Sequence, residues 1–115
     1  MATISTHVLD TANGNPAKGV SITLKAERYG EFHPIGSGVT NADGRVADLV
    51  EADFKPLVSG VYQMSFNVEQ YMEDTGRENY FYPYVDITFR IESADNHYHV
   101  PLLISPYGFS TYRGS

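Results

Sequence analysis

The chain contains no cysteine among its 115 residues. That absence excludes a disulfide scaffold, thiol catalysis and a structural zinc site with cysteine ligands. No apolar run approaches the length of a membrane span, and no basic segment followed by an apolar one suggests a signal peptide. The final residues are Arg-Gly-Ser rather than the peroxisomal Ser-Lys-Leu tripeptide. We therefore expect a cytoplasmic protein that does not engage a membrane.

Positive charge is also scarce. The chain has eight Lys and Arg residues and fourteen Asp and Glu residues, and its formal net charge is −6. This balance disfavours nucleic acid and anionic membranes as partners, because neither would be attracted to the chain as a whole. An anionic substrate would have to be held by local arginines. The length and the 42% hydrophobic content indicate a single globular domain over residues 1–115.

Alternation of apolar and polar residues dominates the chain and is clearest at 20–27, 62–67 and 85–92. This period of two is typical of strands with one buried face. Asn, Gly, Asp and Pro residues at 13–16 and 41–44 predict turns between strands. The pattern predicts an all-β, Greek-key β-sandwich of about eight strands.

One segment has the spacing of a helix instead of a strand. Val68, Tyr71 and Met72 follow the i, i+3, i+4 pattern of a buried helix face. Asn67 is a suitable N-terminal cap, and Gly76 is a suitable end. We therefore predict one short helix after the fifth strand, held by packing rather than by intrinsic propensity.

Two histidines are expected on outer strand faces. In the run 97–104, Tyr98 and its apolar neighbours at every second position belong to the core, which turns His99 outward. In the first strand, Ile4 and Val8 are expected to face the core, which turns His7 outward. Arg45 directly follows the Asp43-Gly44 turn, at the start of a short strand over residues 46–49.

Histidine can take a proton from water and return it near neutral pH, and arginine can bind a planar anion or a developing oxyanion. Strand alternation permits His7, His99 and Arg45 to converge but does not require it, so ordinary solvated histidines are an alternative. A metal bound by His97 and His99 is a second alternative, with His7, His33 or a carboxylate as a third ligand. No serine lies in a Gly-x-Ser-x-Gly elbow.

Five segments together resemble the transthyretin-related proteins along the whole chain. In transthyretin itself the positions of His7, Arg45 and His99 are lysine, glutamate and threonine. This chain is therefore similar to the other branch, the 5-hydroxyisourate hydrolases, whose C-terminal Tyr-Arg-Gly-Ser is intact here. The segments are Ser-Thr-His-Val-Leu-Asp at 5–10, Thr-Asn-Ala-Asp-Gly-Arg at 40–45, Phe-Tyr-Pro-Tyr at 81–84, His-Val-Pro-Leu-Leu at 99–103 and Ser-Thr-Tyr-Arg-Gly-Ser at 110–115.

The resemblance implies a reaction in urate breakdown. The hydrolase adds water to the C6 carbonyl of 5-hydroxyisourate and cleaves the bond to N1, which gives 2-oxo-4-hydroxy-4-carboxy-5-ureidoimidazoline. It implies no metal and no organic cofactor. The alternatives are a non-catalytic small-molecule carrier of the transthyretin type and a purely structural module.

The resemblance also implies the residues of the site. His7 and His99 would deprotonate the water and protonate the leaving nitrogen, while Arg45 would bind substrate and offset charge on the intermediate. Ser115 is expected among the catalytic residues, and Tyr112, Arg113 and Ser115 among those that bind substrate. The family implies a homotetramer, built as a dimer of dimers, with these sites at the subunit interface.

Overall fold

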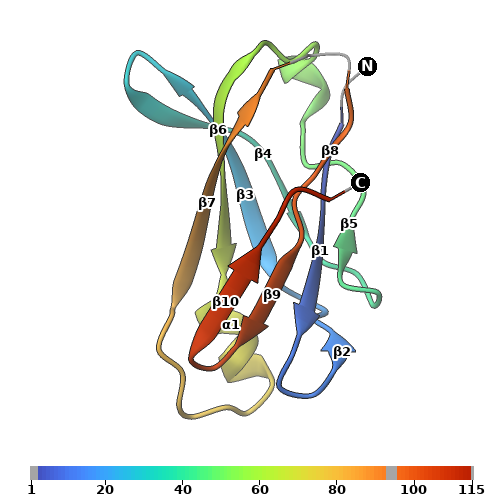
Figure 1. The fold of residues 1–115 in the computed structure, drawn as a ribbon, viewed down its shortest axis with the longest axis vertical. Helices are drawn as coiled ribbons and strands as arrows, with labels where there is room; N and C mark the ends of the chain where they lie inside the picture. The colour runs from blue at the N-terminus through green and yellow to red at the C-terminus, as the bar shows by residue number, and fades with distance from the viewer. Residues whose placement is uncertain (1–2, 93–95, 115) are drawn as a thin grey trace.

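A computed structural model describes residues 3–92 and 96–114. Two β-sheets pack face to face and enclose one core (Figure 1). The six strands of the first sheet are β1 (Ile4–Asp10), β2 (Asn15–Pro16), β5 (Arg45–Val46), β8 (Tyr98–His99), β9 (Leu102–Ser105) and β10 (Gly108–Thr111). The four strands of the second sheet, in spatial order, are β4 (Glu31–Val39), β3 (Ser21–Arg28), β6 (Gly60–Asn67) and β7 (Tyr84–Ile91).

The alternating segments form the strands that were predicted. The apolar positions of β3, β6 and β7 are buried against those of β1, β8 and β9, so the all-β sandwich is confirmed. Residues 3–92 and 96–114 form ten strands, where the sequence predicted about eight. The run from 98 to 105 is split into β8 and β9, and the two residues of β2 were not recognised. The strand expected over 46–49 is also shorter and consists of Arg45 and Val46.

The predicted helix is α1 (Val68–Asp74), which follows β6 because β2 adds one strand to the count. The Asn67 side chain accepts a hydrogen bond of 3.2 Å from the backbone N–H of Gln70, as an N-terminal cap does. Gly76 has φ 78°, and its N–H donates to the carbonyl of Glu73 just past the helix. A further 3₁₀ turn, η1 (Ala52–Phe54), was not predicted. None of the helices in the described ranges is long and apolar enough to cross a membrane.

The N-terminal strand lies in the middle of the first sheet. One edge of β1 pairs in parallel with β8 and β9, and the other edge pairs antiparallel with β2 and β5. β10 pairs antiparallel with β9 and forms one border of this sheet. The register therefore brings residues from the beginning, middle and end of the chain onto neighbouring strands.

The core contains one carboxylate. Asp10 is 0% exposed at the end of β1 and accepts hydrogen bonds from the Tyr71 hydroxyl, at 2.7 Å, and the Arg77 guanidinium, at 2.6 Å. Burial alone would raise the pKa of Asp10, but the bonds from Arg77 and Tyr71 outweigh it and hold the pKa below its ordinary value. Burial and the bond to Asp10 raise the pKa of Tyr71 to about 12. The three side chains tie α1 and the segment after it to β1.

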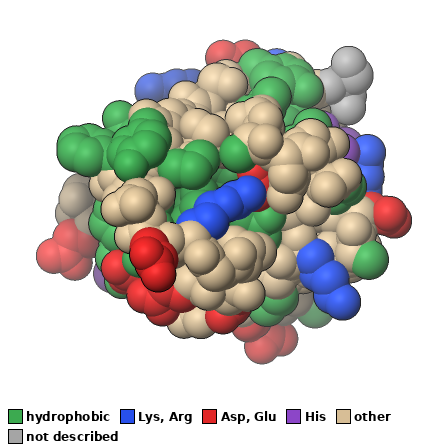
Figure 2. Space-filling view, turned by 90° about the horizontal axis from the view of Figure 1, so that it is seen from below, with side chains coloured by type: hydrophobic (Ala, Val, Ile, Leu, Met, Phe, Trp, Pro, Cys, Tyr) green, Lys and Arg blue, Asp and Glu red, His purple; other side chains and the backbone are tan. Residues whose placement is uncertain are grey.

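Aromatic side chains are exposed at the end of the sandwich that carries α1 and the β9–β10 turn. Figure 2 views this end and shows hydrophobic side chains gathered on one side of it. Tyr82 contacts Phe81 and Phe109 edge to face, with ring centroids 4.9 and 5.2 Å apart. We call this the aromatic patch, and its exposed members are Phe81, Tyr107 and Phe109.

Candidate active site

The outer face of β1 carries the first site residues. Ile4 and Val8 are fully buried, as predicted, whereas His7 and Leu9 are half-buried on the opposite face. Ser5 shares that outer face and is only 8% exposed. A hydroxyl and an imidazole thus lie two residues apart on one strand, pointing the same way.

Arg45 lies directly across from His7 on the neighbouring strand β5. The turn before it is fixed by Asn41, whose side-chain oxygen accepts hydrogen bonds from the backbone of Asp43 at 2.9 Å and of Arg45 at 3.0 Å. Gly44 has φ 74°, and a Cβ there would lie 2.4 Å from the carbonyl oxygen of Val8. Only glycine fits this turn, which presents Arg45 to the outer face.

His99 lies across from Ser5 on the other edge of β1. Its Nδ1 is 2.7 Å from the Ser5 hydroxyl oxygen, and that oxygen is also 3.1 Å from Nε2 of His97. Nδ1 of His97 in turn contacts the Thr3 hydroxyl. His99 and Arg45 flank the central strand, so their Cα atoms are on the order of 10 Å apart across two strand spacings. A hollow of about 360 Å³ lies over this surface and is lined in part by Ser5, Arg45 and both histidines of the 97–99 segment.

The environment of His99 disfavours its charged form. Burial comes first, and the positive charge of Arg45 and the nearby His97 and His7 rings act in the same direction. The pKa of His99 therefore lies below the ordinary value for histidine. Its imidazole is neutral at neutral pH and is able to accept a proton.

The C-terminal segment packs against His99. The Gly114 N–H donates a 2.8 Å hydrogen bond to the carbonyl of His99 in β8. This bond extends the pairing of β10 with β9 towards β8. A Cβ on Gly114 would lie 2.4 Å from Cδ2 of the His99 ring, well inside normal contact distance. Glycine at this position is therefore required for the ring to keep its place.

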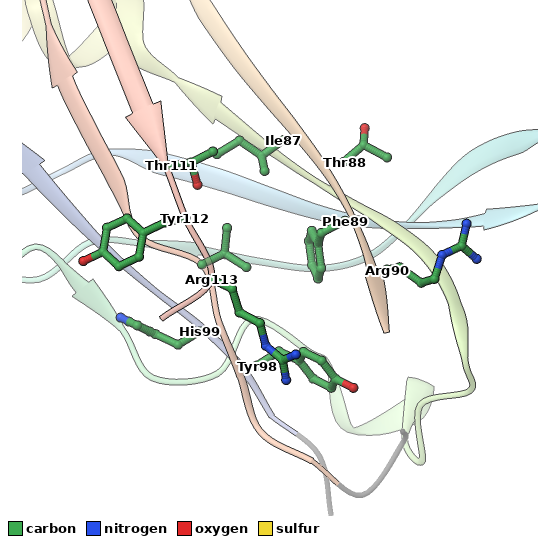
Figure 3. A pocket seen from close by; sticks show the side chains of 10 residues that line it. Ile87, Thr88, Phe89, Arg90, Tyr98, His99, Thr111, Tyr112 and Arg113 are labelled. Atoms are coloured by element: carbon green, nitrogen blue, oxygen red, sulfur yellow. The ribbon is translucent and has the colours of Figure 1, made fainter. Parts of the chain in front are cut away.

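Tyr112 and Arg113 leave this segment in opposite directions (Figure 3). Tyr112 points to the same side as His99, whereas the Arg113 guanidinium lies over the Tyr98 ring, 5.0 Å from its centroid. All four line a second hollow of about 330 Å³ between β7 and the end of the chain. The structure thus brings His7, Arg45 and His99 onto one face, with Tyr112 beside His99 and Arg113 turned away from it. Ser115, the remaining predicted site residue, lies outside the described residues.

The metal alternative finds no ligand set within residues 3–92 and 96–114. No group of three or more His, Asp or Glu side chains there is arranged to hold a metal ion. His33 is exposed on β4 in the other sheet and lies 3.9 Å from Glu31.

Three contacts at this face were missed at the level of sequence. The sequence gives no sign that the Ser5 hydroxyl bridges two imidazoles. It suggests His97 only as a metal ligand, and it indicates no contact between Gly114 and His99. Only the pairing of β1 with β8 and the return of the C-terminal segment reveal these contacts.

Comparison with known proteins gives matches along nearly the whole chain. The chain matches the model of the HIUase/Transthyretin family over residues 4–114. A Pseudomonas aeruginosa protein named 5-hydroxyisourate hydrolase is 46% identical over 120 aligned residues, which cover 100% of this chain and 93% of that protein.

Solved structures show the same fold. Klebsiella pneumoniae 5-hydroxyisourate hydrolase superposes with a TM-score of 0.82 at 41% identity, with 100% of both chains covered. Sea bream transthyretin in complex with thyroxine superposes with a TM-score of 0.87 at 26% identity, covering 97% of this chain and 94% of its own. The family match, the near-complete coverage and the shared sandwich together establish that this chain belongs to the HIUase/Transthyretin family.

Proposed function

We propose that this protein hydrolyses 5-hydroxyisourate to 2-oxo-4-hydroxy-4-carboxy-5-ureidoimidazoline in urate breakdown. The observation that carries the proposal is the outer face of the first sheet, where Arg45 and His99 line one hollow and His7 lies directly across from Arg45. The relatives at 40–46% identity include proteins named as this hydrolase from Pseudomonas and mouse. No metal or organic cofactor enters the proposal.

The geometry supports hydrolysis by activated water. A histidine takes a proton from water, and the hydroxide attacks the C6 carbonyl of the bound ring. The Arg45 guanidinium offsets the negative charge that forms on the carbonyl oxygen. The C6–N1 bond then breaks, the nitrogen takes a proton from an imidazolium, and C6 becomes the carboxyl group of the product. One water is consumed, and the neutral His99 is suited to the first transfer.

Activity tests this function directly. Urate oxidase generates 5-hydroxyisourate in place, and its ultraviolet absorbance is followed with and without the protein. We expect decay far faster than the spontaneous rate, and a loss of about 100- to 10,000-fold in His99→Ala. His33→Ala is the matched control, because His33 is an exposed histidine of the other sheet. Decay no faster than in buffer, from folded protein, would contradict the proposal. Binding of substrate without turnover would then favour the carrier alternative.

We further propose that the chain works as a homotetramer, a dimer of dimers with the site at a subunit interface. Within a single chain the hollow over His99 and Arg45 is open on its outer side, and Leu9 and Leu103 are partly exposed on the same face. β7 and β10 are the border strands of their sheets, and the aromatic patch lies next to both. Pairing of such edges and patches between copies covers apolar surface and closes the site.

The assembly is tested with one residue of the aromatic patch. Tyr107 is 68% exposed, and Tyr107→Glu places a charge where a second copy would pack. We expect a smaller species by light scattering coupled to size exclusion, together with loss of activity. Tyr29→Glu, at an exposed turn between β3 and β4, is the control and should leave both unchanged. A monomer that hydrolyses substrate at the full rate would refute the assembly proposal but leave the reaction standing.

A further inference from the structure

A chain of hydrogen bonds runs from the surface to His99. It begins at the Thr3 hydroxyl, passes through the exposed His97 ring and the Ser5 hydroxyl, and ends at Nδ1 of His99. The Ser5 oxygen lies 3.1 Å from His97 and 2.7 Å from His99, so one hydroxyl bridges two imidazoles. The function proposed above uses only His99, the last residue of this series of hydrogen bonds.

The contacts around the His99 ring leave one reactive atom available. Ser5 occupies the Nδ1 edge, and the backbone of Gly114 lies against the Cδ2 edge. Among the residues that the structure describes, none forms a hydrogen bond with Nε2 of His99. The imidazole is thus held from two sides with Nε2 as the atom free to meet water or substrate.

The Ser5 hydroxyl has a single proton to share between its two histidine neighbours. If it donates to Nε2 of His97, its oxygen is left to accept from His99, which must then carry its proton on Nδ1. Nε2 of His99 then has a free lone pair, as a general base requires. With this direction of donation, Ser5 and His97 together set the tautomer of His99.

We propose that Ser5 and His97 are positioning residues that hold His99 as the general base of the hydrolysis and carry away the proton that it takes from water. This inference rests on the proposed function. Neither residue needs to touch the substrate, because both act through the Nδ1 side of the His99 ring.

The proton transfers balance along the chain. Water gives a proton to Nε2 of His99, and the resulting hydroxide forms the new bond to the substrate carbonyl. The Nδ1 proton of His99 then moves to the Ser5 oxygen as the Ser5 proton moves to Nε2 of His97. His99 is then neutral with its proton on Nε2, and the exposed His97 is the imidazolium. When Nε2 of His99 gives its proton to the leaving nitrogen, Ser5 returns a proton to Nδ1 of His99 and His97 returns one to Ser5, so that both histidines end in the forms in which they began.

The charges around His99 are consistent with this transfer. Burial and positive groups on neighbouring strands disfavour an imidazolium at His99, which favours transfer of the proton away from its ring. The titratable and charged groups that face His99 or line the adjoining hollows are His7 on β1, Arg45 on β5, Arg90 on β7, His97 and Tyr98 next to it in the chain, and Tyr112 and Arg113 on the C-terminal segment. No carboxylate is among these groups in the described part of the chain.

The first test reads the tautomer and requires no substrate. Long-range ¹H–¹⁵N spectra of the histidine side chains, recorded above the pKa of histidine, distinguish a ring proton on Nδ1 from one on Nε2. We expect His99 to carry its proton on Nδ1 in the parent protein and to shift toward the Nε2 form in Ser5→Ala. Ser5→Thr, which keeps the hydroxyl, should restore the Nδ1 form. An unchanged tautomer in Ser5→Ala would overturn the inference.

The second test uses turnover. Ser5→Ala should lower kcat about 10- to 100-fold with KM changed less than about twofold, and Ser5→Thr should recover most of the loss. His97→Gln keeps a hydrogen-bonding group beside Ser5 but cannot accept a proton. We expect it to lower kcat about 10-fold and to make the acidic limb of the kcat–pH profile shallower by one proton, since one of two coupled groups is lost. His33→Gln, the matched control, should change neither.

The outcomes separate this inference from the function beneath it. Hydrolysis by the parent protein with unchanged kcat and unchanged pH profile in Ser5→Ala and His97→Gln would overturn the relay alone. Absence of hydrolysis by the folded, assembled parent protein would overturn the function and with it the role of His99 as base. A loss of kcat in Ser5→Ala that Ser5→Thr does not recover would also count against the relay, because it would indicate a packing effect.

Discussion

Gly114→Ala is the sharpest test of how the C-terminal segment serves the site. The added Cβ would lie 2.4 Å from Cδ2, 3.1 Å from Cγ and 3.3 Å from Cβ of His99. Carbon atoms in contact normally stay about 3.5–4.0 Å apart. Relief therefore requires a displacement of more than about 1 Å at the closest pair, shared between the ring and the chain end. The His99 ring is held on its other edge by Ser5, so the 2.7 Å bond at Nδ1 must stretch or break.

The magnitude follows from the displacement. A misplacement of about 1 Å in a group that must meet a reacting atom can cost about 100-fold in rate. We expect a loss of this size in kcat for Gly114→Ala. The stability should change little, because the added methyl lies at the end of the chain and disturbs no core side chain.

Steady-state kinetics with 5-hydroxyisourate generated in place, together with thermal unfolding, checks this prediction. Gly108→Ala is the matched control on the same β-hairpin, where a Cβ would meet only the Ser105 hydroxyl oxygen at 3.6 Å. It should retain activity within about twofold. Gly114→Ala in a His99→Ala background should add no further loss, since both changes act through one ring. A fully active Gly114→Ala variant would refute the reasoning.

Three further predictions concern the core and the pH dependence. Asp10→Ala leaves Arg77 without its buried partner and should cost about 3–5 kcal/mol in urea unfolding, whereas Tyr71→Phe should cost about 1.5–3 kcal/mol. The pKa of Asp10 lies below its ordinary value in the folded state, so its contribution is present above that ordinary value. This contribution is lost as the pH falls through the folded pKa. The free energy of unfolding should therefore fall less steeply with decreasing pH in Asp10→Ala than in the parent protein. Gly36→Ala would place a Cβ 1.6 Å from the backbone oxygen of Leu49 and should prevent folding to soluble protein. Because the pKa of His99 is lowered, kcat should stay constant as the pH is lowered to the ordinary histidine pKa and should decline only at lower pH. An acidic limb centred above the ordinary histidine pKa would contradict the proposed environment.

Much of the fold could be predicted because its buried faces obey a simple period. The alternating residues of β3, β6 and β7, and the helical spacing around Tyr71, each encode their own burial. The two-residue strands do not, since β2, β5 and β8 are defined by their pairing with β1 rather than by any pattern of their own. The burial of Asp10 could not be predicted either. An aspartate at the end of a strand has the signature of a turn, and its partner Arg77 is far away in the sequence.

The same distinction applies to the site. Strand alternation placed His7 and His99 on outer faces, and the structure confirms both placements. Their arrangement around β1 could not be predicted, because no residue pattern in either segment indicates the parallel register that sets Ser5 opposite His99. The contact of Gly114 with the ring depends on the path of the last residues, which only the folded chain defines.

The two sheets differ in how much of the chain must exist before they can form. The sheet of β3, β4, β6 and β7 is assembled antiparallel from one continuous stretch, 21–91, largely through neighbours in sequence. The sheet that carries the histidines joins β1 to β8 and β9, across nearly the whole length of the chain. Such long loops close slowly, so this sheet is expected to form last as the chain emerges from the ribosome. A chain shortened before β8 and β9 would thus keep the strands of the second sheet but lack the face on which His99 lies next to β1.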